Sequence, residues 1–284
     1  MLTEKTFQGS AVRINYVEGP SGGQPVLLLH GVTQRWQAFL SLFPQLTQTH
    51  HVFAIDFRGH GKSGHVARGY RGEDFAQDVL AFIHEIIVKP VVIYGHSLGG
   101  MVGVYVAGLC PERVRALIIG DSKLFLRNLN GSMYGQMFKK TLELLRQRLT
   151  FEGLCGAISE MVLDSPLYGK VPMKDLPGCD EIYLAAWCRS LLQLDPDVLQ
   201  MLSDGSSAAN WRPEELLRKI TCPTLLMQAD PRMGGLMTDE GVARARELLS
   251  HSQHVCLTGL GHSLQLADPA PVLRVMTNFL ACLP

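Results

Sequence analysis

Short apolar runs recur along the chain, separated by stretches of helical periodicity. Each run is rich in Val, Ile and Leu and is apolar at consecutive positions rather than at alternate ones. A strand with this pattern is buried on both faces, as in a parallel sheet covered by helices. We predict such buried strands at 26–29, 52–55 and 91–94, and further strands of the same sheet at 114–119, 224–227 and 255–257.

Amphipathic segments between these strands predict crossover helices. Phe75, Val79 and Phe82 recur at helical spacing before the strand at 91–94. At the N-terminus, loose alternation over 7–18 predicts an antiparallel hairpin at the sheet edge. Strands that alternate with helices imply right-handed crossovers. The fold class is therefore α/β, with a mostly parallel central sheet flanked by helices. Further core helices are expected at 101–109, 239–249 and 271–280.

The alternation of strands and helices stops after residue 122. From Lys123 to about Asn210 no strand is predicted, and helical segments are separated by Pro, Gly and Asp. We expect residues 123–210 to form a helical cap, or lid, inserted into a core made of 1–122 and 211–284. The expected cap helices lie at 137–149, 154–163, 182–194 and 196–203.

Composition narrows the expected partners and location. A chain of 284 residues with 46% hydrophobic residues is neither disordered nor fibrous. Lys plus Arg equals Asp plus Glu at 26 each, and no long basic run occurs, so no nucleic-acid partner is expected. The chain has no apolar leader and no membrane-length apolar stretch, and its seven cysteines are scattered without a C-x-x-C pair. We expect a cytoplasmic protein that acts on a small-molecule substrate and does not contact a membrane. The sequence does not indicate its oligomeric state.

One hexapeptide, Gly95-His96-Ser97-Leu98-Gly99-Gly100, lies between a predicted strand and a predicted helix. A strand that turns at once into a helix forces its apex residue into a strained conformation and crowds the adjoining backbone. Glycines two positions before and after the apex relieve that crowding. The pattern G-x-S-x-G in this context predicts Ser97 as a nucleophile at a helix N-terminus.

The order of these segments carries a resemblance to a known family. A strand, the elbow, a helix, a helical insertion, a strand and Gly261-His262 follow one another. The chain thereby resembles the α/β-hydrolase fold superfamily, over essentially its whole length except the insertion, and in particular its capped serine esterases and lactonases. His30-Gly31-Val32 looks like the family's oxyanion loop. The resemblance implies a fold and a reaction type but no substrate.

In this superfamily the nucleophile, the acid and the histidine follow in that order along the chain. The resemblance implies that His262 is the general base for Ser97. Two aspartates compete for the role of acid. Asp230 follows the strand at 224–227, in the usual region but at a different offset, and Asp121 ends the preceding strand, at the other position that the superfamily uses. The sequence leaves this choice open.

The resemblance also implies an oxyanion hole made of two backbone N–H groups. The fold supplies one from Leu98, the residue after the nucleophile, and one from Val32, in the loop after the first buried strand. A side-chain donor, from Thr33 or Gln34, is the alternative.

Aromatic and Met residues of the expected cap are candidates for a substrate pocket and favour an apolar substrate. No histidine pair has the H-x-x-x-H spacing of a metal site, and the glycine-rich stretch at 56–63 lacks the spacing of a phosphate loop. Neither a metal nor an organic cofactor is expected. The pocket candidates are Phe125, Tyr134, Met137, Phe138, Tyr183 and Trp187.

These residues predict a serine hydrolase that cleaves a carboxylic ester or lactone of a small, largely apolar substrate through an acyl-enzyme intermediate. Hydrolysis of a carbon–carbon bond, an amide or a carbamate uses similar parts and stays open. Alternatives from other classes are a non-catalytic ligand receptor on the same fold and an acyl transferase.

Overall fold

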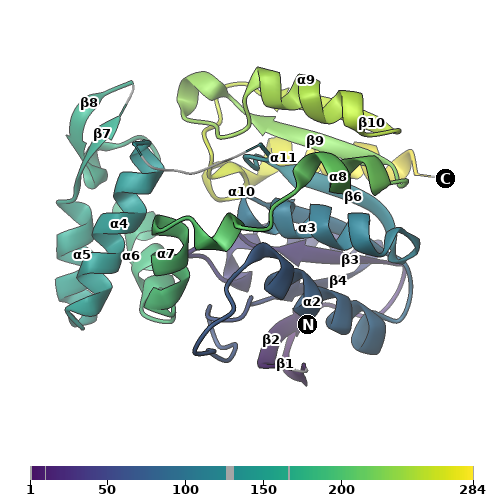
Figure 1. The fold of residues 1–284 in the computed structure, drawn as a ribbon, viewed down its shortest axis with the longest axis horizontal. Helices are drawn as coiled ribbons and strands as arrows, with labels where there is room; N and C mark the ends of the chain where they lie inside the picture. Colours follow the sequence, from purple (N-terminus) through teal and green to yellow (C-terminus); the bar gives the residue numbers. More distant parts are fainter. Residues whose placement is uncertain (1, 10, 126–130, 166, 284) are drawn as a thin grey trace.

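A central sheet of eight strands organises the computed structural model, which describes residues 2–9, 11–125, 131–165 and 167–283 (Figure 1). The strand order is β1-β2-β4-β3-β5-β6-β9-β10. All pairs from β4 to β10 are parallel, while β1 and β2 form an antiparallel hairpin at one edge. The predicted fold class is confirmed. The strands are β1 (Thr3–Gln8), β2 (Arg13–Glu18), β3 (Gln24–Leu29), β4 (His50–Ile55), β5 (Val91–His96), β6 (Val114–Gly120), β9 (Thr224–Ala229) and β10 (Ser252–Leu257).

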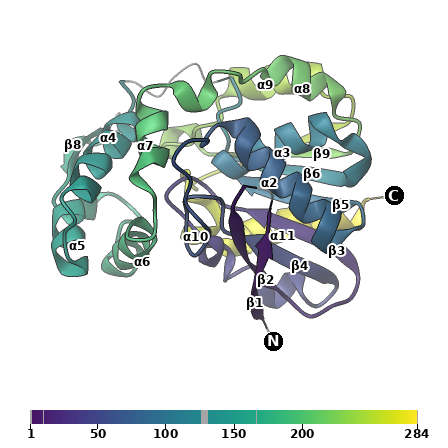
Figure 2. The ribbon, with the colours of Figure 1, turned by 60° about the horizontal axis from the view of Figure 1, so that its bottom comes forward.

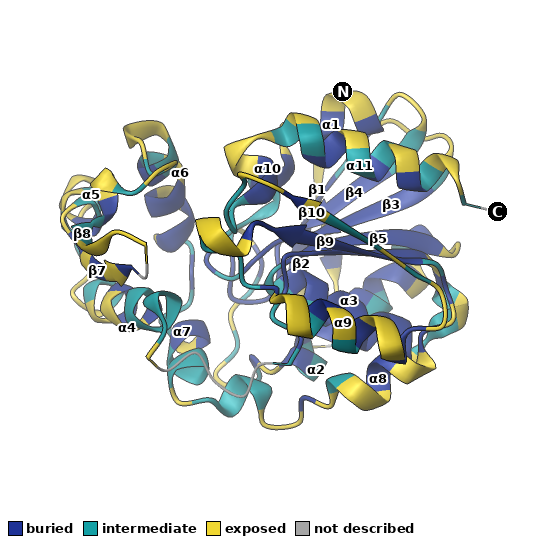
Figure 3. Ribbon diagram, turned by 90° about the horizontal axis from the view of Figure 1, so that it is seen from above, coloured by how far each residue is buried: buried dark blue, intermediate teal, exposed yellow. Residues whose placement is uncertain are grey.

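Helices cover both faces of this sheet, so that its inner strands are buried (Figure 3). One face carries α2 (Gly72–Phe82), α3 (Leu98–Leu109), α8 (Pro213–Lys219) and α9 (Asp239–Leu248). The other carries α1 (Phe43–Leu46), α10 (Leu264–Ala267) and α11 (Pro269–Ala281). Short turns of 3-10 helix, η1 (Trp36–Phe39), η3 (Pro111–Arg113) and η6 (Pro231–Met233), and of π-helix, η2 (Ile83–Ile87), complete the core.

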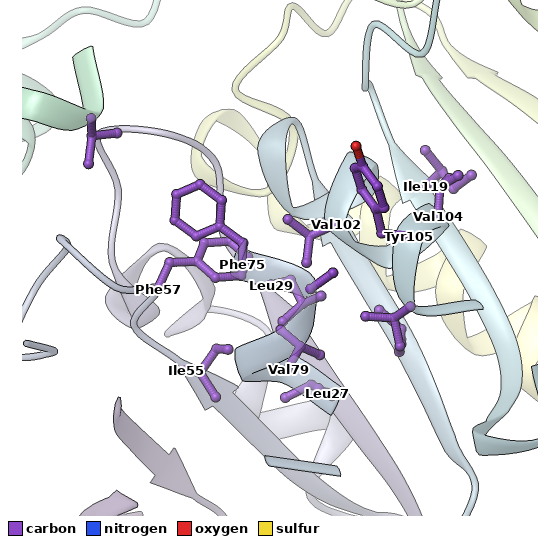
Figure 4. Packing of buried hydrophobic residues seen from close by; sticks show 14 of the residues in the cluster. Leu27, Leu29, Ile55, Phe57, Phe75, Val79, Val102, Val104, Tyr105 and Ile119 are labelled. Atoms are coloured by element: carbon purple, nitrogen blue, oxygen red, sulfur yellow. The ribbon is translucent and has the colours of Figure 1, made fainter. Parts of the chain in front are cut away.

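The sheet is apolar on both faces. Successive side chains of a strand point to opposite sides, so consecutive apolar residues place apolar side chains on both. Leu27 and Leu29 of β3 join Val79 of α2 in one buried cluster (Figure 4). Val26 and Leu28 of the same strand join a second cluster on the opposite face. Consecutive apolar positions in the sequence therefore correspond to a strand buried on both sides, as predicted.

The chain changes direction across the sheet at β3. Strand β4 follows β3 in sequence and pairs with it on one side, whereas β5 pairs with β3 on the other side. In open α/β sheets, ligands bind beyond the carboxyl ends of the strands at such a switch point. The loops that follow β3 and β5 meet there, and they contain His30-Gly31-Val32 and Ser97.

The elements between β6 and α8 lie together at one end of the molecule, apart from the sheet (Figures 1 and 2). We call the described part of residues 123–210 the insertion. Its buried side chains belong to the same apolar cluster as the α2–α3 face of the sheet. The insertion comprises α4 (Met133–Arg146), α5 (Phe151–Ser159), β7 (Val162–Ser165), β8 (Gly169–Pro172), η4 (Met173–Asp175), α6 (Glu181–Leu191), α7 (Pro196–Ser203) and η5 (Ser206–Ala208).

One sequence prediction for the insertion is wrong. It contains an antiparallel hairpin, β7–β8, where no strand was expected and where the helix at 154–163 was expected to continue. Exposed and buried side chains alternate along β7, with Leu163 and Ser165 facing inward, which is the pattern of a half-buried strand. None of the described helices is long and apolar enough to cross a membrane.

Candidate active site

The turn from β5 into α3 holds Ser97 in a strained conformation, with φ 55° and ψ −116°. Its neighbours leave no room for side chains. A Cβ on Gly95 would lie 2.1 Å from the Gly99 carbonyl oxygen, and a Cβ on Gly99 would lie 2.0 Å from that of Leu29. Non-glycine residues with positive φ are uncommon, and such strain is concentrated at functional sites. The predicted elbow around Ser97 is therefore present in the structure.

Three side chains from different strand ends form a continuous hydrogen-bonded chain. The Nε2 atom of His262 lies 3.1 Å from the Ser97 Oγ, and its Nδ1 atom lies 2.6 Å from the Asp121 Oδ2. An ionised carboxylate only accepts hydrogen bonds, so Nδ1 carries the ring proton. Nε2 is then left with a lone pair facing the serine hydroxyl. This arrangement can remove the proton from Ser97.

Asp121 is fully buried directly after β6, and backbone groups hold its carboxylate. The N–H groups of Ala229, Leu236 and Met237 donate to it over 3.2, 2.8 and 3.0 Å. Burial alone raises the pKa of this carboxyl, but the hydrogen bond and charge of His262 and these N–H groups outweigh burial and lower the pKa below its usual value. Asp121 is thus kept as an anion beside the imidazole.

Asp230, the other candidate acid, has different partners. Its carboxylate accepts from the Arg232 Nε and Nη2 over 3.1 and 3.0 Å and from the Gly259 N–H over 3.0 Å. Hydrogen bonds from Arg232, followed by that from Gly259, hold the pKa of Asp230 well below its usual range. Asp230 also accepts from the Arg232 N–H at the start of η6. The structure brings Asp121 to His262, while Asp230 braces the loops after β9 and β10.

Two backbone N–H groups near Ser97 are available to a ligand. Neither the Leu98 nor the Val32 N–H donates to a protein acceptor in the described part of the chain. Leu98 begins α3, where the first N–H groups of a helix have no acceptor within the helix. Both residues line the cavity described below, as Ser97 does.

A cavity of about 430 Å³ opens over Ser97, between the strand ends and the insertion. Tyr134, Met137, Phe138, Tyr183 and Trp187 line it, as predicted, together with further apolar residues. Lys123 is the one lysine or arginine among its described lining residues, which include no carboxylate. The residues that sequence reasoning missed include Met101, Leu163, Met173, Leu176, Met233 and Leu236. Such a cavity suits a mostly apolar small molecule.

Phe125, the remaining pocket candidate, is placed elsewhere. It lines a small separate cavity with Leu236, Met237 and Gly241, and is not among the residues around Ser97. The segment after β6 turns toward the start of α9 at this point, which carries Phe125 away from the serine. The described residues contain no cluster of His, Cys, Asp or Glu with the makings of a metal site.

Sequence comparison assigns this arrangement to a family. The family model described as "Alpha/beta hydrolase family" matches residues 26–275, which is most of the chain. The chain belongs to the alpha/beta hydrolase family. The predicted resemblance is confirmed, and the chain is an alpha/beta hydrolase by family and by fold.

Relatives of this hydrolase share different portions of it. The 2-(acetamidomethylene)succinate hydrolase of Mesorhizobium japonicum is 24% identical over 274 residues, covering 93% of this chain and 90% of that protein. A serine hydrolase-like protein of Danio rerio is 37% identical over 125 residues, which are 43% of this chain and only 38% of that relative. The solved esterase of Exiguobacterium antarcticum has a TM-score of 0.76 at 19% identity, covering 98% of this chain and all of that one, and shows the shared fold.

Two aromatic rings contact the His262 imidazole. The His96 ring lies 4.8 Å from it and the Tyr134 ring 5.2 Å from it, centroid to centroid. The His96 Nε2–H donates to the His262 carbonyl oxygen over 2.7 Å. Burial, and then the proximity of His262, lower the pKa of His96 to about 3, so His96 stays neutral. His96 thus supports the His262 loop and also lines the cavity.

Proposed function

We propose that this hydrolase cleaves a carboxylic ester or lactone of a small, largely apolar substrate through an acyl-enzyme. The observation that carries the proposal is the hydrogen-bonded chain from Ser97 Oγ through His262 to Asp121. Serine is too weakly acidic to attack a carbonyl unaided, and an adjacent oriented imidazole activates it. Asp121 is the acid in this proposal, and Asp230 has a structural role.

The residues act in two half-reactions. Ser97 attacks the carbonyl carbon while His262 Nε2 takes its proton, and the Asp121 carboxylate stabilises the imidazolium that forms. The Leu98 and Val32 N–H groups donate to the oxyanion, and one such donor lowers the barrier by about 3 kcal/mol. His262 then protonates the leaving alcohol. Water, deprotonated by the same imidazole, releases the acid and restores Ser97.

The insertion acts as a cap in this proposal, and the core is made of residues 1–122 and 211–284. The support is that Trp187 and Tyr183 of α6 and Phe138 of α4 line the same cavity as Ser97 and His262. A cap over the serine excludes water and positions an apolar acyl group. Met-rich lining adapts to substrates of irregular shape.

Hydrolysis of an amide is the second candidate. The observation in its favour is that the relative aligned over 93% of this chain is named a hydrolase of 2-(acetamidomethylene)succinate. The same serine, imidazole and oxyanion donors serve an amide, with a leaving amine in place of the alcohol. Rates on ester and amide pairs with one acyl group would separate the two candidates.

The test measures initial rates on p-nitrophenyl esters of increasing acyl length, with Ser97→Ala as the matched variant. We expect turnover with a length optimum in the wild-type protein and a loss of about 10⁴-fold or more in Ser97→Ala. A fluorophosphonate probe should label the wild-type chain at Ser97 only. Folded wild-type protein without turnover at any length, or an active Ser97→Ala, would overturn the ester proposal.

A further inference from the structure

Thr33 has an unusual backbone conformation beside the proposed oxyanion hole. Its φ is 67°, in the left-handed region that β-branched residues rarely adopt. It directly follows Val32, is only 4% exposed and lines the cavity over Ser97. A non-glycine residue in this region costs about 1–3 kcal/mol and persists only where its surroundings enforce it. Part of the surroundings that hold Thr33 in this conformation belongs to the insertion.

A tryptophan of the insertion fixes the orientation of the Thr33 hydroxyl. The Trp187 Nε1–H on α6 donates to the Thr33 Oγ1 over 2.9 Å, and Trp187 is 6% exposed. An indole nitrogen only donates, so the Thr33 oxygen is the acceptor in this bond. Its own O–H hydrogen has no protein acceptor in the described part of the chain. The hydroxyl is therefore a donor without a protein acceptor, on a residue that lines the cavity.

A second contact joins the same loop to the insertion. The Arg35 Nη1 donates to the Gln193 Oε1, just after α6, over 3.2 Å. The loop after β3 is thus tied to α6 and its C-terminal end at two points, both within three residues of the Val32 N–H. These two hydrogen bonds restrain the position of the strained loop relative to the insertion.

We propose that the Thr33 hydroxyl is a third donor to the oxyanion, oriented by Trp187. The inference rests on the function proposed above. When Ser97 attacks, the carbonyl oxygen gains charge and accepts from Leu98 N–H, Val32 N–H and Thr33 O–H. None of these three donors gives up its hydrogen; the only proton transferred in this step is that of Ser97, which His262 takes. Thr33 is then a catalytic residue, and Trp187 is a positioning residue that acts through it.

Three variants test the proposal on the full chain. Thr33→Val keeps the shape and removes the donor; Thr33→Ser keeps the donor. Trp187→Phe keeps most of the ring and removes the indole N–H. Loss of one oxyanion donor lowers kcat by about 10²–10³-fold. We expect Thr33→Val to lose kcat by about that factor with KM changed less than about threefold. Thr33→Ser should keep most of the activity, and Trp187→Phe should fall between the two.

Affinity for phenylboronic acid supplies a readout that a structural role would not change. This probe adds to a nucleophilic serine as a tetrahedral anion, so its affinity should fall in Thr33→Val in parallel with kcat. Thr141→Val is the matched control, because it removes another buried threonine hydroxyl that does not line the cavity. We expect it to leave kcat and the boronate affinity unchanged. Titration of Ser97 with a fluorophosphonate gives the fraction of folded sites in each variant.

The outcomes separate the two proposals. No ester turnover by the wild-type protein overturns the proposed function itself. Turnover that needs Ser97 but survives in Thr33→Val, or that changes only in KM, overturns the role of Thr33. If Thr33→Val does not fold, the other two variants decide. An unchanged kcat and boronate affinity in Trp187→Phe would overturn the positioning by Trp187. A loss of about 10²–10³-fold in kcat in Thr33→Ser, which keeps the hydroxyl, would overturn its role as a donor.

Discussion

The strand ends of the core and the insertion meet at one cavity, but they tolerate change differently. At the elbow, a Cβ on Gly95 or Gly99 would lie about 2 Å from a backbone oxygen. In the insertion, a Cβ on Gly156 or Gly178 would have no heavy atom within 4 Å. At the elbow, crowded backbone that cannot shift positions the reactive serine, whereas these two positions of the insertion have space around them. We expect chemistry to depend on the first region and substrate choice on the second.

The largest expected effect separates the two aspartates at the strand ends. Asp121→Asn removes the acceptor that fixes the His262 tautomer, and we expect kcat/KM on p-nitrophenyl butyrate to fall by about 10³–10⁴-fold. Asp230→Asn leaves that contact intact, so its kcat/KM should fall less than about tenfold, with a lower melting temperature from the lost Arg232 and Gly259 contacts. The reverse order of activities would show that Asp230 is the acid.

The sequence could not choose between these aspartates for a physical reason. Both aspartates follow strands whose carboxyl ends lie at the same edge of the sheet. These strands, β6 and β9, are neighbours, so the two positions lie about one strand spacing apart. Which carboxylate reaches His262 depends on how loops far apart in the chain are directed. Asp230 accepts from the backbone and guanidinium of Arg232, two residues on, and Asp121 accepts from N–H groups of the loop after β9. Side-chain spacing alone carries no signal for either.

Regular periodicity made the rest of the core predictable. The elbow, the buried strands and the place of His262 follow from apolar runs and glycines that only one local structure accommodates. The insertion was harder to predict, because Leu163 fits a helical pattern as well as the strand β7 that it occupies. The helix expected at 239–249 is α9, which Thr238 caps, while Asp239 accepts from the Gln228 side chain.

The second prediction tests the crowding at the elbow. Gly99→Ala places a Cβ 2.0 Å from the Leu29 carbonyl oxygen, which belongs to a central strand and cannot withdraw. We expect a loss of at least about 3 kcal/mol in the free energy of unfolding by guanidinium, or no folded protein. Gly103→Ala on the same helix is the matched control, since its Cβ would meet the Leu117 side chain at 2.9 Å and a side chain can adjust. Equal losses in both would refute the argument from backbone contact.

The third prediction concerns how the stability of the core falls in acid. Burial lowers the pKa of His60 to about 4 and that of His96 to about 3, and that of His30 well below its usual value. The unfolded chain therefore binds more protons than the folded one below pH 6.5, so stability falls as pH falls from 6.5 toward 4. Each histidine contributes a slope of about 1.4 kcal/mol per pH unit.

Guanidinium unfolding at pH 7.5, 6 and 5 measures this slope. The insertion sequence, residues 123–210, contains no histidine, so the proton-linked loss is expected in the core. His60→Gln should reduce the slope by one proton. Stability that stays flat between pH 6.5 and 5, or a slope unchanged in His60→Gln, would contradict the assignment to buried neutral histidines.

The fourth prediction tests whether the insertion sets substrate choice. Phe138 of α4 and Leu202 of α7 line both the cavity over Ser97 and a second cavity of about 240 Å³. Phe138→Ala should join the two and raise the ratio of kcat/KM for p-nitrophenyl dodecanoate over butyrate by about tenfold. Met137→Ala, which lines only the first cavity, should change that ratio less. An unchanged ratio in Phe138→Ala would place the limit on chain length elsewhere.

The smallest effect is expected in open space within the insertion. Gly156 lies inside α5 at ordinary helical φ, and a Cβ there meets nothing within 4 Å. Gly156→Ala should therefore raise the free energy of unfolding by about 0.5–1 kcal/mol, because alanine loses less backbone entropy in a helix. Gly178→Ala has equal space but φ 78°, so it should destabilise the protein. If Gly156→Ala is also destabilising, the insertion is as tightly constrained as the elbow, and the division between a fixed core and an adaptable cap does not hold.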